Sequence, residues 1–269
     1  MNFAFLDDGR PAGADALRAL AVANYGHFTS MQVRGGAVRG LDLHLRRLQA
    51  ATGELFGVGL DAARVRAAMR AAVEAAGGDC SLRVTVFSRQ FDHRRPLPPV
   101  PVEVLATVSP AASAAGAIRV KCFEFVRTLP QVKHVGTFPL FHYRRQALAA
   151  GFDDALFVDA RGDVVEGSLW NVGFWDGQSV LWPTGPALRG TMEQLLQRGL
   201  EQIGVPQRSL RLRPEAGADP AGAGFAGAFA VNATGIQPIV AIDGRDCLQA
   251  AELPGLLQRA LETQPWQAV

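Results

Sequence analysis

Hydrophobic and polar positions repeat with two different periods over residues 1–110. A period of two predicts strands with one buried face, and apolar residues three or four positions apart predict helices. The predicted elements, in chain order, are a strand over 28–34, a return strand beyond the turn at Gly35-Gly36, helices over 42–56 and 61–76, and strands over 80–88 and 101–108. Asp42 and Asp61 are expected to cap the helices, because an aspartate accepts hydrogen bonds from the first N–H groups of a helix. This mixture predicts an α+β domain.

The rest of the chain also mixes helices and strands, with two hairpins at its centre. Its predicted elements are a strand over 118–126, a helix over 141–150, hairpins over 154–167 and 171–182, a helix from 191 to about 203, strands near 207–213, 227–233 and 237–242, and a helix over about 246–264. The stretch PAASAAGA (110–117) is predicted to be an interdomain linker or a plain loop, and the Ala-, Gly- and Pro-rich stretch 215–224 a loop. We therefore expect two domains, 1–112 and 113–269.

Composition narrows the classes of protein to which the chain can belong. Its 269 residues are 48% hydrophobic and 19% charged, which is typical of a globular protein and excludes disorder as its main state. A net charge of +2 without a basic tract does not favour nucleic acid as a partner. No apolar run approaches the roughly 18 residues of a membrane-spanning helix, so no membrane partner is expected.

Leader and metal-binding patterns are also missing from the sequence. The start MNFAFLDDGR has no basic region followed by an apolar stretch, so we expect no signal peptide. Three widely spaced cysteines fit a reducing compartment, which predicts a cytoplasmic protein. The five histidines form no HxxxH or HExxH pattern, and we therefore expect no metal site.

The two lysines stand out among the 27 basic residues, because the other 25 are arginines. Arginine can replace lysine in most surface roles but does not supply a nucleophilic amine, so a surviving lysine is a candidate for chemistry. Lys133 lies in PQVKHVGTFP, where its neighbours are not charged. A lysine removed from solvent loses its proton more readily and can then attack a carbonyl carbon. The alternative is a surface lysine that keeps only its amine in water.

Further candidates lie where strands end and helices begin. Glu166 ends the strand VVE, where a site residue or a solvated turn carboxylate is expected. Gly190-Thr191 opens a helix and is either an anion site or a simple cap. The segment 232–235 (NATG) is a second anion cradle or a plain loop. Arg47, on the helix over 42–56, is either a fixed positive charge for such an anion or a surface arginine.

Taken together and in order, four segments resemble the class IV aminotransferase family, the fold-type IV pyridoxal-phosphate enzymes that include branched-chain and D-amino-acid aminotransferases and aminodeoxychorismate lyase. The segments are YGHFTSMQVRGGAVRGLDLHLRRL (25–48), Lys133 in its PxxKH setting, GFDDALFVDARGDVVEGSLWNVGFW (151–175), and LRGTM (188–192) followed by NATGIQPIVAIDG (232–244). The resemblance implies a two-domain fold with a small α/β N-terminal domain and a larger C-terminal domain around a β-barrel-like core. It also implies pyridoxal 5'-phosphate as the cofactor and a homodimer as the assembly.

The resemblance assigns a role to each matching residue. Lys133 matches the lysine that forms the Schiff base and moves the proton, and Glu166 matches the carboxylate that pairs with the pyridine nitrogen. The residues matching the cofactor site, phosphate cradle and ring contact are Arg47, Leu188, Gly190, Thr191, Met192, Ala233 and Thr234. Tyr25, Thr29 and Phe138 fall where the family recognises substrate.

Departures from the family pattern concern the substrate more than the cofactor. Met192-Glu193 stands where the family usually has Thr-Arg or Met-Arg, and Phe138 stands where many members have a tyrosine. The expected function is transfer of an amino group from an amino acid or amine to a 2-oxo acid. The alternatives are aminodeoxychorismate lyase, which the sequence Phe28-Thr29-Ser30 resembles, and a non-catalytic relative that binds pyridoxal phosphate.

Overall fold

The structure is a computed structural model that describes residues 3–6, 9–113, 116–214 and 224–269. The chain divides into two compact units. The first contains Met1–Ala112, Val132–Thr137 and Trp266–Val269, and the second contains Ser113–Gln131 and Phe138–Pro265.

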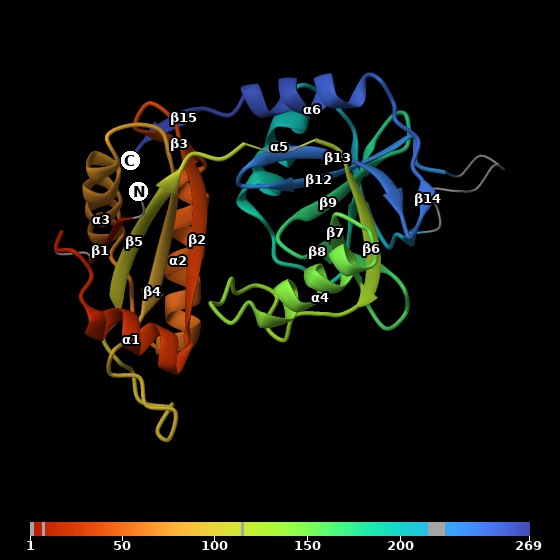
Figure 1. The fold of residues 1–269 in the computed structure, drawn as a ribbon. Coiled ribbons are helices and arrows are strands. Elements are labelled where there is room, and N and C mark those ends of the chain that lie inside the picture. Colours follow the sequence, from red (N-terminus) through yellow and green to blue (C-terminus); the bar gives the residue numbers. More distant parts are fainter. Residues whose placement is uncertain (1–2, 7–8, 114–115, 215–223) are drawn as a thin grey trace. The chain divides into compact units, whose positions relative to one another are not determined.

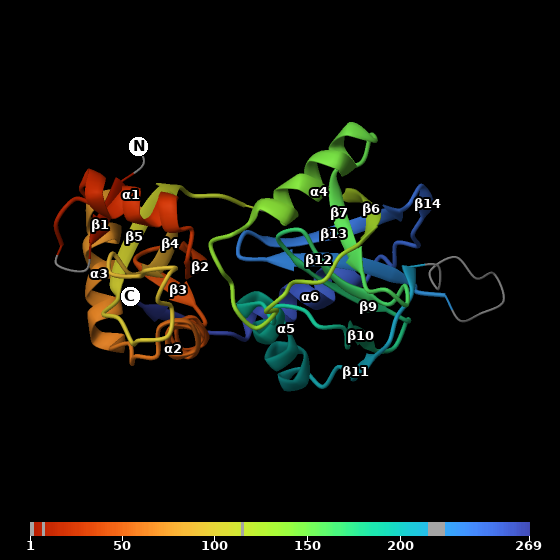
Figure 2. The same ribbon diagram turned by 90° about the horizontal axis from the view of Figure 1, so that it is seen from below.

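The first unit is an antiparallel sheet with two helices packed on one face and a third helix packed on the other (Figures 1 and 2). Its sheet has the strand order β1-β5-β4-β2, and the short strands β3 and β15 pair separately. The strands are β1 (Phe3–Leu6), β2 (Gly26–Val33), β3 (Ala37–Arg39), β4 (Cys80–Phe87), β5 (Glu103–Pro110) and β15 (Trp266–Ala268). The helices are α1 (Ala14–Ala23), α2 (Leu41–Phe56) and α3 (Ala62–Ala76).

Alternation along the strands decides which side chains meet the helices. Leu82 and Val84 of β4 and Val104 of β5 share one buried cluster with Val65 and Met69 of α3. The residues between them point to the opposite face, because successive side chains of a strand alternate. Asp61 caps α3 as predicted, with its side chain accepting from the N–H of Ala63 at 2.8 Å.

The second unit is built on a nine-stranded mixed sheet that curls around its core. The strand order is β11-β10-β9-β12-β13-β6-β7-β8, and β14 pairs with β13. The strands are β6 (Ile118–Glu124), β7 (Asp154–Val158), β8 (Val164–Gly167), β9 (Asn171–Trp175), β10 (Val180–Pro183), β11 (Gln207–Leu210), β12 (Gly227–Asn232), β13 (Gly235–Ile242) and β14 (Arg245–Asp246). The helices are α4 (Phe138–Ala149), α5 (Thr191–Gln202) and α6 (Leu253–Glu262).

Two buried layers in this unit follow from the same alternation. Ala155 and Phe157 of β7 face α4, whereas Leu156 belongs to the core enclosed by the sheet. Helices α5 and α6 lie side by side in both ribbon views (Figures 1 and 2). Their close approach requires Gly199, because a Cβ there would lie 2.0 Å from the carbonyl oxygen of Ala260. None of the helices in the described residues is long and apolar enough to cross a membrane.

The predicted elements are found, but several of their ends differ from the prediction. Helix α4 begins at Phe138 rather than at 141, and strand β11 ends at Leu210 rather than at 213. Helix α2 begins at Leu41 after Gly40, whose φ of 68° is left-handed, so Asp42 is not the cap and instead bonds Arg46 at 2.6 Å. The last helix begins at Leu253 rather than near 246. Asp243-Gly244 forms a hairpin turn with positive φ at both residues, and the chain returns as β14 before the helix.

Four elements were not predicted, namely β1, α1, β14 and β15. The predicted linker 110–117 begins at the last residue of β5, and its residues 114–115 lie outside the described part. The loop predicted over 215–224 also lies outside it, except for Gly224. The α+β fold class is confirmed.

Candidate functional site

Lys133 lies in the short segment Val132–Thr137 of the first unit, and the segments before and after it, Ser113–Gln131 and Phe138–Pro265, belong to the second unit. Its segment pairs with the edge of β2. The N–H of Phe28 donates to the carbonyl of Lys133 at 2.8 Å, and the N–H of Val135 donates to the carbonyl of Gly26 at 2.9 Å. Lys133 Nζ lies 5.1 Å from the centre of the Phe28 ring. Backbone pairing to a packed sheet therefore fixes the half-buried lysine.

Arg47 enters the same unit from α2 and meets a buried polar pair. Its Nη2 donates to Thr29 Oγ1, and Thr29 Oγ1 lies 2.6 Å from His44 Nδ1. Thr29 is fully buried and His44 is 4% exposed. The spacing of α2 explains the geometry, because residues three apart on a helix share one face, and that face lies against β2.

The Arg47 guanidinium is a buried positive charge for which the described part of the chain provides no counter-charge. Burial lowers the pKa of the Arg47 guanidinium to about 10. Its Nε has no hydrogen-bond partner, and no carboxylate among the described residues forms an ion pair with it. Burial, and then the charges of Arg47 and Lys133, holds the pKa of His44 well below its usual 6.5. The arrangement is suited to an anion, because a buried charge is stable only when it is paired.

A second buried pair lies beside this one. His27 Nε2 is 3.0 Å from Thr52 Oγ1, and both residues are buried. Burial, and then the charge of Arg47, lowers the pKa of His27 from 6.5 to about 4. Between about pH 6.5 and pH 4, the unfolded chain binds a proton here that the folded chain does not, so stability falls as the pH falls. At about 1.4 kcal/mol per pKa unit, His27 should remove about 3 kcal/mol of unfolding free energy over this range.

Denaturant unfolding at pH 7 and pH 4 measures this loss. The control variant is His27→Gln, which does not titrate and whose amide can still bond Thr52. We expect the variant to lose about 3 kcal/mol less than the wild type between the two pH values. Equal losses in the two proteins would show that His27 is protonated in the folded state.

Glu166 of the second unit ends β8 and is 2% exposed, so it is not a solvated turn carboxylate. Arg127 Nε lies 2.7 Å from Glu166 Oε1, and each side chain is only 3% exposed. The sequence did not single out Arg127. The only sequence feature that could have indicated it was its position shortly before Lys133. An arginine does not stand out in a chain that has 25 of them.

The backbone after Glu166 is held by close packing and by a second polar cluster. Gly167 is required, because a Cβ there would lie 2.0 Å from the ring of Trp170. Ser168 Oγ donates to Asp154 Oδ1 at 2.5 Å, and Asp154 Oδ2 lies 3.4 Å from Arg144 Nε. The strand end that carries Glu166 is thus fixed on both sides.

The turn from Leu188 to Thr191 is shaped by Asn171 of β9. Asn171 Nδ2 donates to the carbonyl of Leu188 at 2.6 Å, and a Cβ on Gly190 would lie 2.1 Å from Asn171 Oδ1. Helix α5 then begins at Thr191. Its first N–H groups and its dipole favour an anion.

Glu193 and Met192 occupy the first turn of α5. Glu193 accepts from the N–H of Gly190 at 3.2 Å and from Arg189 Nη1 at 2.9 Å. Burial raises the pKa of this carboxyl group, and Arg189 partly opposes that rise. Glu193, which departs from the family pattern, therefore accepts the N–H of Gly190. An anion at the start of α5 would have to bind N–H groups further along the helix.

The second cradle lies between β12 and β13. The N–H and the hydroxyl of Thr234 both donate to Asn232 Oδ1, at 2.9 Å and 2.6 Å. Ala233 lies in the same turn. The Thr234 hydroxyl has one proton, so it must turn away from Asn232 in order to donate to an anion.

The residues expected at the substrate site are found in three different settings. Tyr25 donates through its hydroxyl to the carbonyl of Leu55 at 3.2 Å and stacks on Phe91 with ring centres 4.1 Å apart. Thr29 contacts Arg47, as described above. Phe138 is the first residue of α4 and is 74% exposed.

The structure groups the predicted residues by unit. Lys133, Arg47, Thr29 and Tyr25 belong to the first unit. Those of the second are Glu166, Leu188, Gly190, Thr191, Met192, Ala233, Thr234 and Phe138. Arg127 and Asn171, which were not among the predicted site residues, also belong to the second unit.

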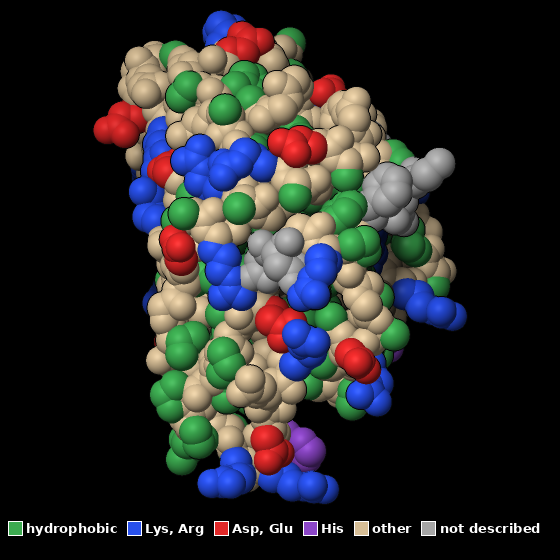
Figure 3. Space-filling view, turned by 90° about the vertical axis from the view of Figure 1, so that its left-hand side faces the viewer, with side chains coloured by type: hydrophobic (Ala, Val, Ile, Leu, Met, Phe, Trp, Pro, Cys, Tyr) green, Lys and Arg blue, Asp and Glu red, His purple; other side chains and the backbone are tan. Residues whose placement is uncertain are grey.

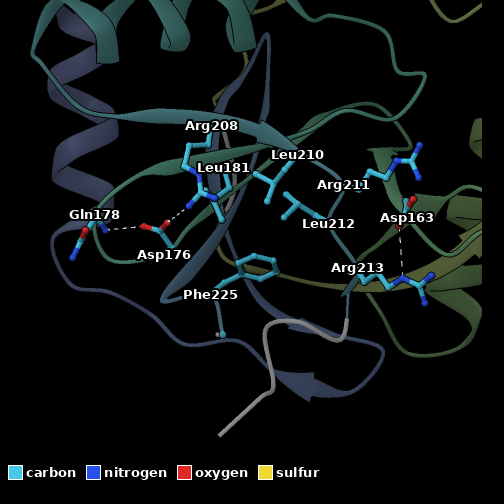
Figure 4. Close-up of a pocket in the computed structure, with 11 residues that line it drawn as sticks. Asp163, Asp176, Gln178, Leu181, Arg208, Leu210, Arg211, Leu212, Arg213 and Phe225 are labelled. Carbon is cyan, nitrogen blue, oxygen red and sulfur yellow. Dashed lines mark hydrogen bonds and ion pairs between the residues drawn. The ribbon is translucent and has the colours of Figure 1, made fainter. Parts of the chain in front are cut away.

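Two surface features involve none of these residues. A pocket in the second unit is lined by Arg208, Arg211 and Arg213 above an apolar floor that includes Phe225 (Figure 4). Arg208 and Arg213 are each paired with an aspartate, at 3.8 Å and 3.7 Å. On the face drawn in Figure 3, basic and acidic side chains are interspersed.

Comparison with known proteins confirms the fold and the resemblance. The family model for amino-transferase class IV matches residues 26–242. The branched-chain amino acid aminotransferase of T.th., complexed with N-(5'-phosphopyridoxyl)-L-glutamate, is 17% identical, with a TM-score of 0.81 over 97% of this chain and 93% of that one. The Escherichia coli branched-chain amino acid aminotransferase is 15% identical, with a TM-score of 0.83 over 97% and 93%.

A third similar structure is a hypothetical aminotransferase from Mycobacterium tuberculosis in its α-ketoglutarate- and PMP-bound form. It is 20% identical, with a TM-score of 0.79 over 96% of this chain and 97% of that one. No curated protein matches the chain by sequence.

Proposed function

Because the chain belongs to the class IV aminotransferase family, whose members use pyridoxal phosphate, we propose that it transfers an amino group from an amino acid or amine to a 2-oxo acid. The observation that carries the proposal is the buried cluster of the first unit. There, a lysine fixed on β2 shares its surroundings with an arginine for which the described part of the chain provides no counter-charge. A phosphorylated aldehyde requires a nucleophilic amine for its aldehyde group and an anion site for its phosphate.

The residues present fit this cofactor. The unpartnered Nε of Arg47 suits a phosphate oxygen, because guanidinium binds phosphate through charge and directed hydrogen bonds. The start of α5 at Thr191 and the hydroxyl of Thr234 are the further candidate donors. Leu188 is the candidate for contact with the ring face.

Bound pyridoxal phosphate supplies an electron-withdrawing ring that stabilises a carbanion at the substrate α-carbon. Lys133 provides at Nζ the amine that carries the cofactor and the base that holds the transferred proton. Glu166 provides the carboxylate for the ring nitrogen, and Arg127 holds one of its oxygens.

The similar structures support transfer rather than elimination. One is complexed with a phosphopyridoxyl derivative of glutamate, and another is bound to PMP and α-ketoglutarate. Amino acid and 2-oxo acid are therefore the proposed substrates. The family resemblance also carries the proposals of a homodimer and of a cytoplasmic location.

A panel of amino donors with a 2-oxo acid acceptor tests the proposed reaction, run beside an assay for 4-aminobenzoate release from aminodeoxychorismate. We expect a new amino acid to form from the acceptor in stoichiometry with the oxo product of the donor. Release of 4-aminobenzoate and pyruvate without transfer would instead identify the lyase. If the protein binds pyridoxal phosphate but shows neither activity, it is the non-catalytic relative.

A further inference from the structure

We propose that Thr29 and His44 are positioning residues that hold the Arg47 guanidinium in place for the cofactor phosphate. The inference rests on the proposed function, in which Arg47 binds that phosphate. It gives Thr29 a role in cofactor binding in place of the substrate role that the family resemblance implied.

The three side chains form a directed chain of hydrogen bonds. Arg47 Nη2 can only donate, so Thr29 Oγ1 accepts from it. The single proton of the Thr29 hydroxyl is then free to point to His44 Nδ1, which is 2.6 Å away. Arg47 Nη2, which can only donate, also lies 3.5 Å from His44 Nδ1, so Nδ1 is the acceptor, the ring proton lies on Nε2 and the ring is neutral.

The surroundings of His44 favour that neutral form. The ring is 4% exposed, and the positive charges of Arg47 and Lys133 both act on it. A protonated ring would carry a third positive charge and would point an N–H at Thr29, whose hydroxyl would lose its acceptor. Burial and charge therefore keep the hydrogen bonds in one direction, with Arg47 donating to Thr29 and Thr29 donating to His44.

The consequence for Arg47 is loss of freedom before any anion arrives. An arginine side chain loses considerable rotamer entropy when a ligand fixes it. A guanidinium that the protein already holds in place loses less entropy when the ligand binds. Thr29 occupies one N–H of Nη2, and Nε is left without a partner. The Nε–H donor is thus held ready for an oxyanion.

The neighbouring pair His27 and Thr52 provides a matched control. It is also a buried histidine bonded to a threonine hydroxyl, at 3.0 Å, and Thr52 also lies on α2. Thr52 Oγ1 donates to the carbonyl of Leu48 at 2.8 Å rather than contacting Arg47. Thr→Val at either position removes a buried hydroxyl, but only Thr29→Val removes the support of Arg47.

The test titrates cofactor-free protein with pyridoxal phosphate and with pyridoxal, which has the same ring and aldehyde but no phosphate. Arg47→Ala should weaken pyridoxal phosphate binding roughly 10- to 150-fold, and Thr29→Val roughly 3- to 10-fold, with pyridoxal affinity unchanged in both. Thr29→Ser keeps the hydroxyl and should bind like the wild type. Thr52→Val should lose stability without a change in either affinity.

A second pair of variants keeps the test decisive if Thr29→Val does not fold. His44→Leu removes the acceptor and should weaken pyridoxal phosphate selectively, whereas His44→Asn places an amide near the position of Nδ1 and should restore most of the affinity. Wild-type affinity in Thr29→Val or His44→Leu, or equal losses for both ligands, would overturn the inference. A wild-type protein that binds no pyridoxal phosphate would instead overturn the proposed function.

Discussion

Replacing Lys133 with alanine is expected to abolish turnover and covalent retention of the cofactor while leaving the fold intact. The backbone of Lys133, not its side chain, pairs with β2, and alanine keeps that pairing. The side chain is assigned both the attacking amine and the proton carrier. Loss of proton transfer alone costs about 10²- to 10⁴-fold in rate, and loss of the covalent step adds to this.

Borohydride reduction followed by intact mass and peptide mapping measures the covalent part. The chain has only two lysines, so Lys121→Ala is the matched control. Lys121 Nζ lies 5.3 Å from the Phe152 ring in the second unit. We expect the added mass on the Lys133 peptide in the wild type and in Lys121→Ala, and none in Lys133→Ala. Label on Lys121 would contradict the assignment.

The second large effect concerns folding, and it follows from the buried ion pair of Arg127 and Glu166. Arg127→Met should lower the free energy of unfolding by about 3–5 kcal/mol, because it leaves a carboxylate buried without its partner. The double variant Arg127→Met/Glu166→Leu should recover part of this loss, since it removes both charges. Denaturant unfolding of the variants measures these changes.

A pair with the same separation that lies partly in solvent provides the control. Arg89 Nε lies 2.7 Å from Glu103 Oε1, and the two side chains are 50% and 20% exposed. Solvent screens such a pair, so Arg89→Met should change stability much less than Arg127→Met. If the two arginine variants lost equal stability, burial would not be what makes the Arg127 pair important.

Local patterns predicted most of the elements because each one carries its own signal. Alternation revealed the strands, and helix α3 had both a spaced apolar face and an aspartate cap. Helix α1 has no such cap, since Gly13 precedes it without a side-chain bond. Strands β1 and β15 are short, and each is defined by a partner strand far away in the sequence.

The candidate site was predictable only where chemistry leaves a mark on composition or motif. Lys133 stood out because lysines are rare here, and the family segments indicated Glu166 and Arg47. The pairing of Lys133 with β2, the Arg127 partner of Glu166 and the Thr29–His44 pair are contacts between distant residues. Neither the hydrophobic periodicity nor the spacing of motifs predicts such contacts, because they form only when distant segments pack together.

The pairing of β3 with β15 has a consequence for the order in which the protein folds during synthesis. The first unit needs residues 266–269, which the ribosome adds only after the whole second unit. Gly40 brings no side chain to the start of α2, and Gln267 Oε1 accepts the N–H of Leu41 at 2.7 Å. The helix that carries Arg47 is therefore completed late, so the nascent first unit emerges from the ribosome without the contacts that finish the start of α2.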